Sequence, residues 1–436
     1  MKIPAHLRTR LAAGVLFAAL LAAATVVPAA AQLRTSTTTP APVLTADDLF
    51  DQSVVRDLRL TMKASDWDAL VEHYLEDTYY RADMEWQGQV VPIVGVRSRG
   101  SGSRNPYKPG LKVAFAQYVD QRFLGLKSVV LVNAIQDPSM LRQRASMAFF
   151  IRMGVPAPRV THVRVFINDE YLGLYMLFEP VDKTFLARIF GPDEQGKAQN
   201  TGFLYDYAWK DGYGFEYLGS DLQIYAELFE ADTRETEAPS VIWGPVESLI
   251  KDINEAADED FERVVGARLD LAKFVRFIAV ENFLADRDSI LGHWGANNFY
   301  LYRFASSRPA EFIAWDKDLA FWAHDYDIYQ GVAANVLARR VLSVPRFGRL
   351  YLESLMACVA AASEPVSEES VTGWFEAQVA LMAAQIRASG IADERKPYSN
   401  ERFEDELQKV LAFPRNRAAF VEREAGKELA EGRLFR

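Results

Sequence analysis

Apolar and polar residues alternate along several segments in the first half of this chain, as they do along half-buried β-strands. Two pairs of these segments flank residues typical of tight turns, Gln87-Gly88 and residues 168–170, and therefore predict hairpins. Ser65 is expected to cap a short helix, and Asp137 begins a longer one. The expected strands are Val55–Met62, Tyr79–Trp86, Gln89–Arg97, Leu111–Phe115, Ser128–Asn133, His162–Ile167 and Tyr171–Phe178.

Helical spacing of apolar residues replaces this alternation from about Trp243 onward. Residues 270–285 are the clearest helix, because their apolar positions fall on one face, and residues 336–431 predict three or four packed helices. Two short strands, Asn298–Phe304 and Glu311–Trp315, interrupt the helical part. A strand-rich part followed by a helix-rich part predicts an α+β fold.

The length and composition indicate a globular protein with more than one lobe. Half of the 436 residues are apolar and a quarter are charged, which excludes a disordered chain, and the length exceeds that of one compact core. We therefore expect a β-rich N-lobe at residues 47–182 and a mainly helical C-lobe at residues 183–436, which contains a hairpin at residues 286–318.

The first residues have the three parts of a secretory signal peptide. A basic start is followed by the apolar run Leu11–Val27 and by the small residues Ala29–Ala31, so we expect cleavage after Ala31. A membrane anchor is the alternative, but the small residues favour cleavage. Residues 32–46 are rich in Thr and Pro and predict a flexible leader. No later apolar stretch is long enough for a membrane span. After cleavage of the signal peptide, the mature protein is therefore expected to be secreted or periplasmic.

Charge and chemistry exclude several classes of protein. The net charge is −10, and loss of the three basic residues in segment 1–31 makes the mature chain more acidic, which argues against a nucleic-acid binder. Cys358 is the one cysteine, so no internal disulfide can form, and it is expected to be a small buried hydrophobe. The histidines lack zinc-site spacing, and neither a G-x-S-x-G elbow nor a P-loop is present.

A loop rich in Gly and Ser lies between two predicted strands and has cations at both ends. Glycine lets the backbone approach an anion closely, and the hydroxyls of Ser101 and Ser103 could bind phosphate oxygens. Arg99 and Arg104 flank these serines, and Lys112 lies on the next strand, where its ammonium group could reach a phosphate. A tight loop with solvated cations is the alternative interpretation.

Three oxygen-bearing side chains are expected to converge at one end of a hairpin. Asp288 follows the 270–285 helix, Asn298 opens one strand, and Asp316 ends its partner. Such groups suit Mg²⁺ or another hard cation, and their order matches the catalytic Asp, metal-binding Asn and metal-binding Asp of protein kinases. Asp and Asn are also common in helix caps and turns, which is the alternative.

The segment around Glu179 has the layout of a hinge. An apolar strand, residues 174–178, leads into the short link Glu179–Asp182 and then into a helix. The backbone of such a link could contact the edge of an adenine ring, although any strand–loop–helix unit has this layout.

Together these segments resemble the CotH (spore coat protein H-like) kinase family. The resemblance covers about residues 50–325. It rests on the blocks VGVRSRGSGSR with KPGLKVAF, FLGLKSVVLVN with DPSMLRQR, MGVPAPR with FINDEYLGLYMLFEPVDKTFL, ENFLADRDSILGHWGANNFYLYR, and FIAWDKDLAFW.

The resemblance implies an atypical protein-kinase-like fold that binds ATP and Mg²⁺ or Mn²⁺ between its lobes, and a secreted enzyme that phosphorylates Ser or Thr of extracytoplasmic or coat proteins. By this match Asp288 is catalytic and Asn298 and Asp316 bind metal. Lys112 is the strand lysine and Arg99 and Arg104 are its flanking arginines. Two positions depart from the family pattern: Asp286 stands where Asn is frequent, and Gln143 occupies a place where Glu is expected. A weakly active or inactive kinase fold with a structural role in a coat therefore stays as the alternative.

Overall fold

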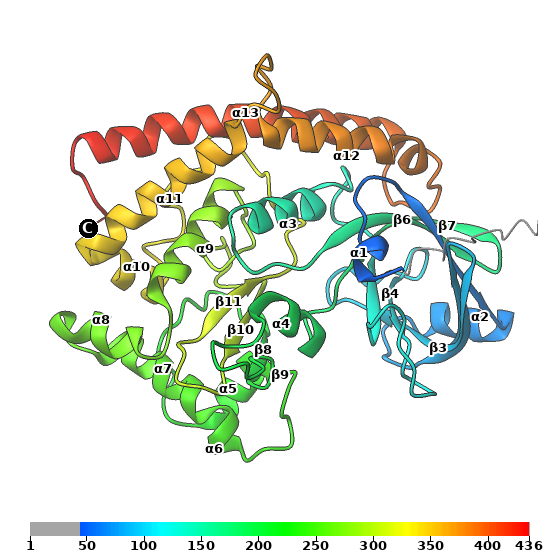
Figure 1. The fold of residues 1–436 in the computed structure, drawn as a ribbon, viewed down its shortest axis with the longest axis horizontal. Helices are drawn as coiled ribbons and strands as arrows, with labels where there is room; N and C mark the ends of the chain where they lie inside the picture. Colours follow the sequence, from blue (N-terminus) through cyan, green and yellow to red (C-terminus); the bar gives the residue numbers. More distant parts are fainter. Residues whose placement is uncertain (1–43, 436) are drawn as a thin grey trace, which may run out of the picture. The chain divides into compact units, whose positions relative to one another are not determined.

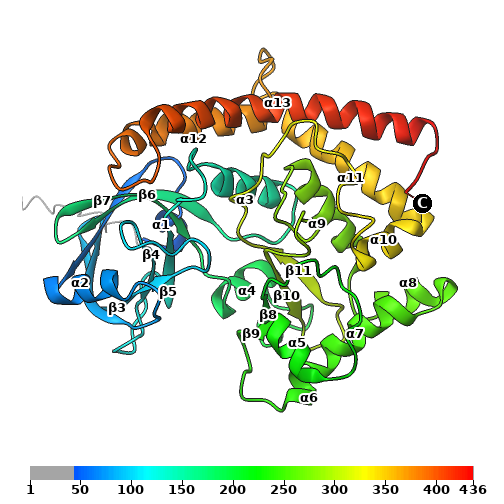
Figure 2. The ribbon, with the colours of Figure 1, turned by 180° about the vertical axis from the view of Figure 1, so that it is seen from behind.

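A computed structural model describes residues 44–435 of the chain. The expected signal peptide, its cleavage site and the leader as far as Val43 lie outside the described residues. Two sheets and thirteen helices form this part of the molecule (Figures 1 and 2), which confirms the α+β class.

Seven strands form a closed barrel. Antiparallel neighbours follow the order β1-β2-β3-β4-β5-β7-β6, and a parallel pairing of β1 with β6 closes the ring. Each end differs from the expected strand by no more than two residues. The hairpin turn at Asn168 and Asp169 has φ angles of 48° and 68°, which these two residue types tolerate better than most. The strands are β1 (Arg56–Met62), β2 (Tyr80–Trp86), β3 (Gln89–Arg99), β4 (Gly110–Ala114), β5 (Ser128–Val132), β6 (Val160–Ile167) and β7 (Glu170–Phe178).

Alternation along the strands gives the barrel two apolar faces. Leu177 on β7 points into the barrel core, together with residues such as Leu58 and Val113. Its neighbours Met176 and Phe178 belong to a second and larger core, which the helices fill. The wall formed by β5, β7 and β6 is therefore buried on both sides, and it joins the barrel to the helical part of the molecule.

A second, four-stranded antiparallel sheet lies within the helical part, in the order β11-β10-β8-β9. The sequence predicts the hairpin of this sheet, β10 (Phe299–Arg303) and β11 (Glu311–Ala314), but not β8 (Phe203–Tyr207) or β9 (Phe229–Ala231). Helix α4 (Lys183–Phe190) covers one face of this sheet with Phe185 and Leu186.

The remaining helices surround this sheet and run along the barrel. Four of them lie between residues 336 and 431, where three or four were expected. In both ribbon views α12 and α13 run side by side across α3 toward β6 and β7 (Figures 1 and 2). The helices are α1 (Ala46–Leu49), α2 (Ala64–Glu72), α3 (Arg142–Arg152), α5 (Leu222–Leu228), α6 (Pro239–Ile242), α7 (Gly244–Glu255), α8 (Asp258–Gly266), α9 (Leu271–Phe283), α10 (Val336–Ser343), α11 (Pro345–Ser363), α12 (Trp374–Ile391) and α13 (Asn400–Ala430).

Two helix starts differ from the sequence expectation. Lys63, not Ser65, precedes α2, and no side chain caps that helix. Asp137 does not begin α3 directly, since its carboxylate accepts hydrogen bonds from the backbone N–H groups of Ser139 and Arg142 and closes a turn. Met140 within this turn has a φ angle of 55°, so the helix can start only at Arg142. Cys358 is buried on α11, as expected.

Buried charges tie the C-terminal helices to the rest of the molecule. Lys108, in the loop before β4, pairs with Asp393 after α12 at 2.7 Å, and both side chains are fully buried. Arg417 of α13 is also buried, and it donates to the backbone carbonyls of Asn282, Phe283 and His324. The end of α9, just before the predicted catalytic segment, is thus held by the last helix.

Candidate active site

The hairpin of β10 and β11 brings the predicted metal-binding residues to one place. Phe299 pairs with Ala314, so Asn298 and Asp316 lie just beyond the same end of the two strands. Both residues have positive φ angles, 60° for Asn298 and 39° for Asp316. Such angles are uncommon outside glycine and often mark functional sites, and here they turn both residues out of the strand pairing.

Asp288 is held in one orientation by two amides. Asn297 Nδ2 donates to one carboxylate oxygen of Asp288 at 3.0 Å, and Asn298 Nδ2 donates to the other at 2.9 Å. Asn298 Nδ2 also reaches the Asp288 backbone carbonyl at 2.8 Å. The structure therefore brings two of the three predicted residues into direct contact, and Asn298 keeps its side-chain oxygen turned away from Asp288.

Asp316 lies beside this pair and is partly buried. Gln143 of α3 donates to its carboxylate from Nε2 at 2.8 Å. Burial raises the pKa of Asp316 to about 6; Arg99 opposes this shift, whereas the charge of Asp288 adds to it. Gln143 thus contacts the predicted metal ligand itself. A Glu at position 143 would place a second carboxylate against Asp316.

A buried ion-pair triad of Lys317, Glu281 and Asp286 supports the two segments that carry Asp288 and Asp316. Lys317 Nζ lies 2.6 Å from Glu281 of α9 and 3.1 Å from Asp286, and it donates to the Asn298 carbonyl. Burial alone would lower the pKa of Lys317, but the two carboxylates raise it. Asp286 in turn accepts a hydrogen bond from the Asp288 backbone N–H. The triad fixes the backbone on both sides of Asp288 and Asp316.

The barrel faces this site with two of the predicted cations. The guanidinium carbon of Arg99 lies 5.7 Å from the ring centre of Trp315, and its charge lowers the pKa of Asp316 and of Asp206 on β8. Lys112 pairs with Arg97 across β4 and β3; burial raises the pKa of Asp232, and the charge of Lys112 opposes this rise. The predicted strand lysine therefore faces the acidic edge of the second sheet.

Other predicted ligand residues have partners elsewhere. Arg104 pairs with Asp77 and donates to the Gly100, Tyr74 and Glu76 carbonyls, so it shapes its own loop. Ser101 at the tip of this loop is exposed, and Ser103 is half-buried.

Glu179 occupies the predicted hinge, between β7 and α4, but its carboxylate is buried between Arg159 and Arg188. The backbone N–H of Glu179 donates to the Arg159 carbonyl. The residue holds the link in place with its side chain.

The donor set fits a hard divalent cation that arrives with a nucleotide. Carboxylate and amide oxygens of Asp288, Asp316 and Asn298 are the ligand types that Mg²⁺ prefers. Within residues 44–435 no three His, Cys, Asp or Glu side chains are arranged to hold a metal ion by themselves. Mg²⁺ is commonly bound by one or two carboxylates together with substrate phosphates, which agrees with this incomplete set.

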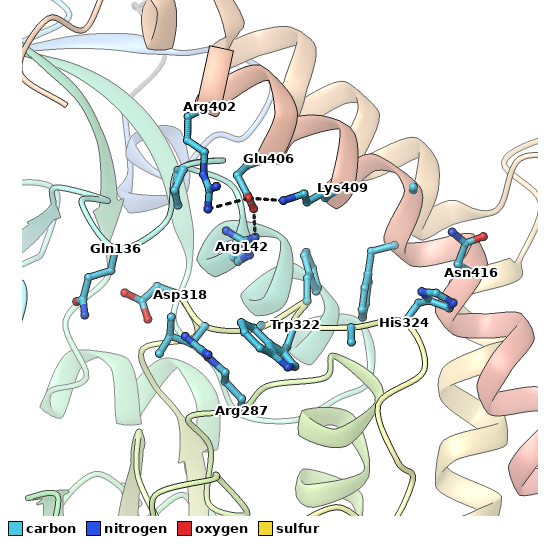
Figure 3. Close-up of a pocket in the computed structure, with 17 residues that line it drawn as sticks. Gln136, Arg142, Arg287, Asp318, Trp322, His324, Arg402, Glu406, Lys409 and Asn416 are labelled. Carbon is cyan, nitrogen blue, oxygen red and sulfur yellow. Dashed lines mark hydrogen bonds and ion pairs between the residues drawn. The ribbon is translucent and has the colours of Figure 1, made fainter. Parts of the chain in front are cut away.

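A cavity of about 670 Å³ opens between α3, α13 and residues 318–324 (Figure 3). Asp318 and Arg287 are among the residues that line this cavity. Glu406 of α13 is buried in its wall with three cations around it: Arg142 at 2.6 Å, Lys409 at 2.7 Å and Arg402 at 3.2 Å.

Sequence reasoning missed Glu281, Asp206 and Lys317. Lys317 lies between two aspartates of a predicted site, and this position could have indicated a role in the site. A short motif does not show, however, that the lysine side chain is buried against acidic partners. Asp206 lies in a strand that the sequence did not predict. Glu281 occupies a buried position of α9, where a lone acid among apolar residues is a signal for a buried partner.

None of the helices in the described part of the chain combines the length and apolar character needed to cross a membrane. The CotH kinase protein family matches residues 96–421. The chain is 25% identical over 342 residues to the "Inner spore coat protein H" of Bacillus subtilis, covering 75% of this chain and 86% of that protein. It is 30% identical over 172 residues to the "Invasin CotH3" of Rhizopus delemar, covering 38% of this chain and 27% of that protein.

Proposed function

Because this chain belongs to the CotH kinase protein family, whose members have a kinase-like fold, we propose that it is a secreted ATP-dependent protein kinase. Its acceptors are Ser or Thr residues of extracytoplasmic or coat proteins. Residues 47–182 form the N-lobe and residues 183–436 the C-lobe. The observation that carries the proposal is the Asp288 carboxylate, which two asparagine amides hold next to Asp316 at the end of a hairpin.

Asp288 is the group that receives the proton of the acceptor hydroxyl. As the hydroxyl oxygen forms its bond to the γ-phosphorus of ATP, the bond from that phosphorus to the bridging oxygen breaks and ADP leaves. The proton passes to the Asp288 carboxylate and then to solvent. Asn297 and Asn298 keep both carboxylate oxygens in place, which favours proton transfer through positioning.

Asp316 and Asn298 are the residues that would hold Mg²⁺ or Mn²⁺, which when bound neutralises charge on the transferred phosphate. Arg99 supplies positive charge from the barrel side, beside Trp315. Lys112 adds a second cation on the neighbouring strand. Secretion rests on the signal-peptide pattern of residues 1–31.

The activity is tested with purified protein, labelled ATP and Mg²⁺ or Mn²⁺, scored as transfer to the protein itself or to serine-rich peptides. Asp288→Asn should reduce transfer roughly 10²–10⁴-fold, because the variant cannot accept the proton. Asp260→Asn, on the exposed face of α8, is the matched control and should transfer at the wild-type rate. Asp286 is a poor control, since its carboxylate is buried against Lys317. Equal transfer by Asp288→Asn and wild type would remove Asp288 from the mechanism.

Nucleotide binding is tested separately through thermal unfolding. ATP should raise the melting temperature only when Mg²⁺ or Mn²⁺ is present, and at 100 times the dissociation constant the added stability is about 2.7 kcal/mol. Asp316→Ala should lose this metal-dependent shift, whereas Asp288→Asn should keep most of it. An unchanged shift in Asp316→Ala would show that Asp316 does not bind the metal.

A structural role in a coat or on a surface, without catalysis, is the second candidate. Two observations favour it: the matched relatives are named as a coat protein and an invasin, and Gln143 replaces an expected acid. This candidate predicts no transfer by the wild type under any metal, and identical behaviour of wild type and Asp288→Asn apart from stability.

A further inference from the structure

Arg287 has an unusual environment for a charged side chain. Its guanidinium carbon lies 3.8 Å from the ring centre of Trp322 and 5.1 Å from that of Trp294. Its Nε atom is buried and has no hydrogen-bond partner among the described residues. None of the ion pairs found in residues 44–435 includes Arg287. Two aromatic rings thus fix the plane of a guanidinium group whose N–H edge has no anionic partner.

The cavity that Arg287 lines has a surplus of positive charge. Four cations line it (Arg142, Arg287, Arg402 and Lys409) against two carboxylates, those of Asp318 and Glu406. Glu406 pairs with the other three cations (Figure 3), and Arg142 also pairs with the buried carboxylate of Asp137. The whole chain carries a net charge of −10, so this local surplus does not follow from composition. It is suited to an anionic ligand.

The cavity lies next to Asp288, so an anion bound in it can belong to the polypeptide that presents the acceptor hydroxyl. Arg287 directly precedes Asp288, yet the two side chains have different surroundings: Asp288 meets Asn297 and Asn298, whereas Arg287 meets the tryptophans and the cavity. Trp322, which lines the cavity, is 54% exposed, and Trp294 beside Arg287 is 41% exposed, so the surface around Arg287 is open to a polypeptide. A chain that presents its hydroxyl to Asp288 would have neighbouring residues within reach of Arg287.

We propose that this cavity binds a phosphorylated residue of the acceptor chain, so that the enzyme prefers Ser or Thr residues close to a phosphate that is already attached. This inference rests on the proposed kinase function. A phosphoserine carries a charge of about −1.5 to −2 and three acceptor oxygens, so this group of cations attracts it more strongly than it attracts one carboxylate. The fork of an arginine also pairs bidentately with phosphate oxygens. Each transfer would add a phosphate that favours transfer to a neighbouring Ser or Thr residue.

Binding is measured first, by calorimetry and without ATP, so that its result does not depend on catalysis. The probes are an alanine-rich peptide with one phosphoserine, the same peptide with serine, and inorganic phosphate. The phosphopeptide should bind the wild type and bind Arg287→Met roughly ten- to hundredfold more weakly, as expected for loss of charged hydrogen bonds. Arg263→Met, an exposed arginine of α8, is the matched control and should bind like the wild type.

Three results of this binding experiment would overturn the inference. Equal binding of the serine peptide would show that phosphate is not recognised. Inorganic phosphate bound as tightly as the phosphopeptide would mark a site for free anions, not for an acceptor chain. Unchanged phosphopeptide binding in both Arg287→Met and the double variant Arg402→Met/Lys409→Met would place the phosphate elsewhere. The double variant changes two long, exposed side chains and covers the case in which Arg287→Met does not fold.

Transfer is measured second, on peptides with an acceptor serine and a phosphoserine one to four residues away on either side. Wild type and Arg263→Met should show a higher kcat/KM for primed than for unprimed peptides at one of these spacings, and Arg287→Met should bring the ratio close to one. No preference at any spacing would overturn the inference while leaving the proposed kinase function intact. No transfer to any peptide or to the protein itself, despite phosphopeptide binding, would count against the kinase function instead.

Discussion

Asp206 shows how a single acid can set the pH response of this protein. It lies on β8, next to Asp232 and Tyr300 and opposite Arg99. Burial raises its pKa to about 7, the charge of Asp232 adds to this, and Tyr300 and Arg99 oppose it. A group with a raised folded-state pKa stabilises the fold at low pH, and this contribution is lost as the pH rises from about 4 through 7.

Asp206→Asn removes this titration. The variant should therefore gain stability relative to the wild type as the pH rises from 5 to 8, by at most about 3 kcal/mol. Urea unfolding at the two pH values measures the change. Asp211→Asn, an exposed neighbour in the chain, should show no such trend. A difference between Asp206→Asn and wild type that is the same at pH 5 and pH 8 would contradict the raised pKa.

Individual residues also show which parts of the site the sequence can predict. Asp288 and Asn298 could be placed together because the hairpin that joins them is local and strongly patterned. Arg104 and Glu179 could not be assigned correctly to their partners, since Asp77 and Arg159 lie more than fifteen residues away along the chain. A sequence pattern shows the chemical type of a side chain, whereas its direction depends on packing from distant segments.

At the scale of elements, one turn extends the parallel pairing of β1 with β6 that closes the barrel. The Asn168 N–H donates to the Leu60 carbonyl, and its side-chain oxygen accepts from the Met62 N–H, each at 2.9 Å. These bonds join the β6–β7 turn to the end of β1. Asn168 also has a φ angle of 48°, which asparagine adopts more readily than alanine.

Asn168→Ala should lower the free energy of unfolding by about 2 kcal/mol, through the lost acceptor and the strained backbone. Asp169→Gly is the matched control within the same turn. Its φ angle of 68° suits glycine, and it loses only an exposed pair with Arg59, so little change in stability is expected. Denaturant unfolding of both variants tests this, and equal stability of the two would show that the contacts of Asn168 do not stabilise the barrel.

The elements that the sequence missed share a physical cause. β8 is a run of five mostly buried residues, Phe203–Tyr207, without alternation, and β9 has only three residues. The strand conformation of β8 depends on pairing with β10, whose residues lie almost one hundred positions later, and β9 pairs in turn with β8. The strands of the barrel were predicted because their hairpin turns and alternating faces are local signals.

At the scale of the molecule, Lys108 and Asp393 join the barrel to the C-terminal helices. Besides their ion pair, Lys108 donates to the Leu174 carbonyl and Asp393 accepts from the Leu174 N–H. A Cβ atom at Gly173 would lie 2.6 Å from an Asp393 oxygen, so only glycine allows β7 to approach this pair. The contact therefore depends on residues from three distant segments.

Asp393→Asn leaves the buried Lys108 without its counter-charge and should cost about 3–5 kcal/mol of stability. Hydrogen exchange should rise in the segment between α12 and α13 as well as in β7. Glu170→Gln, which breaks the exposed pair with the neighbouring Arg395, should cost less than about 1 kcal/mol. A loss in Asp393→Asn no larger than in Glu170→Gln would show that the buried pair does not hold the two parts together.

The contacts of Arg417 have a consequence for the order of biosynthesis. This arginine supports the carbonyls at the end of α9, immediately before the turn that carries Asp288, yet it lies on the last helix of the chain. A nascent polypeptide that has not yet extended past α12 leaves these carbonyls without their donor. Translation from the N-terminus thus completes the support of the segment that carries Asp288 only after α13 has been made.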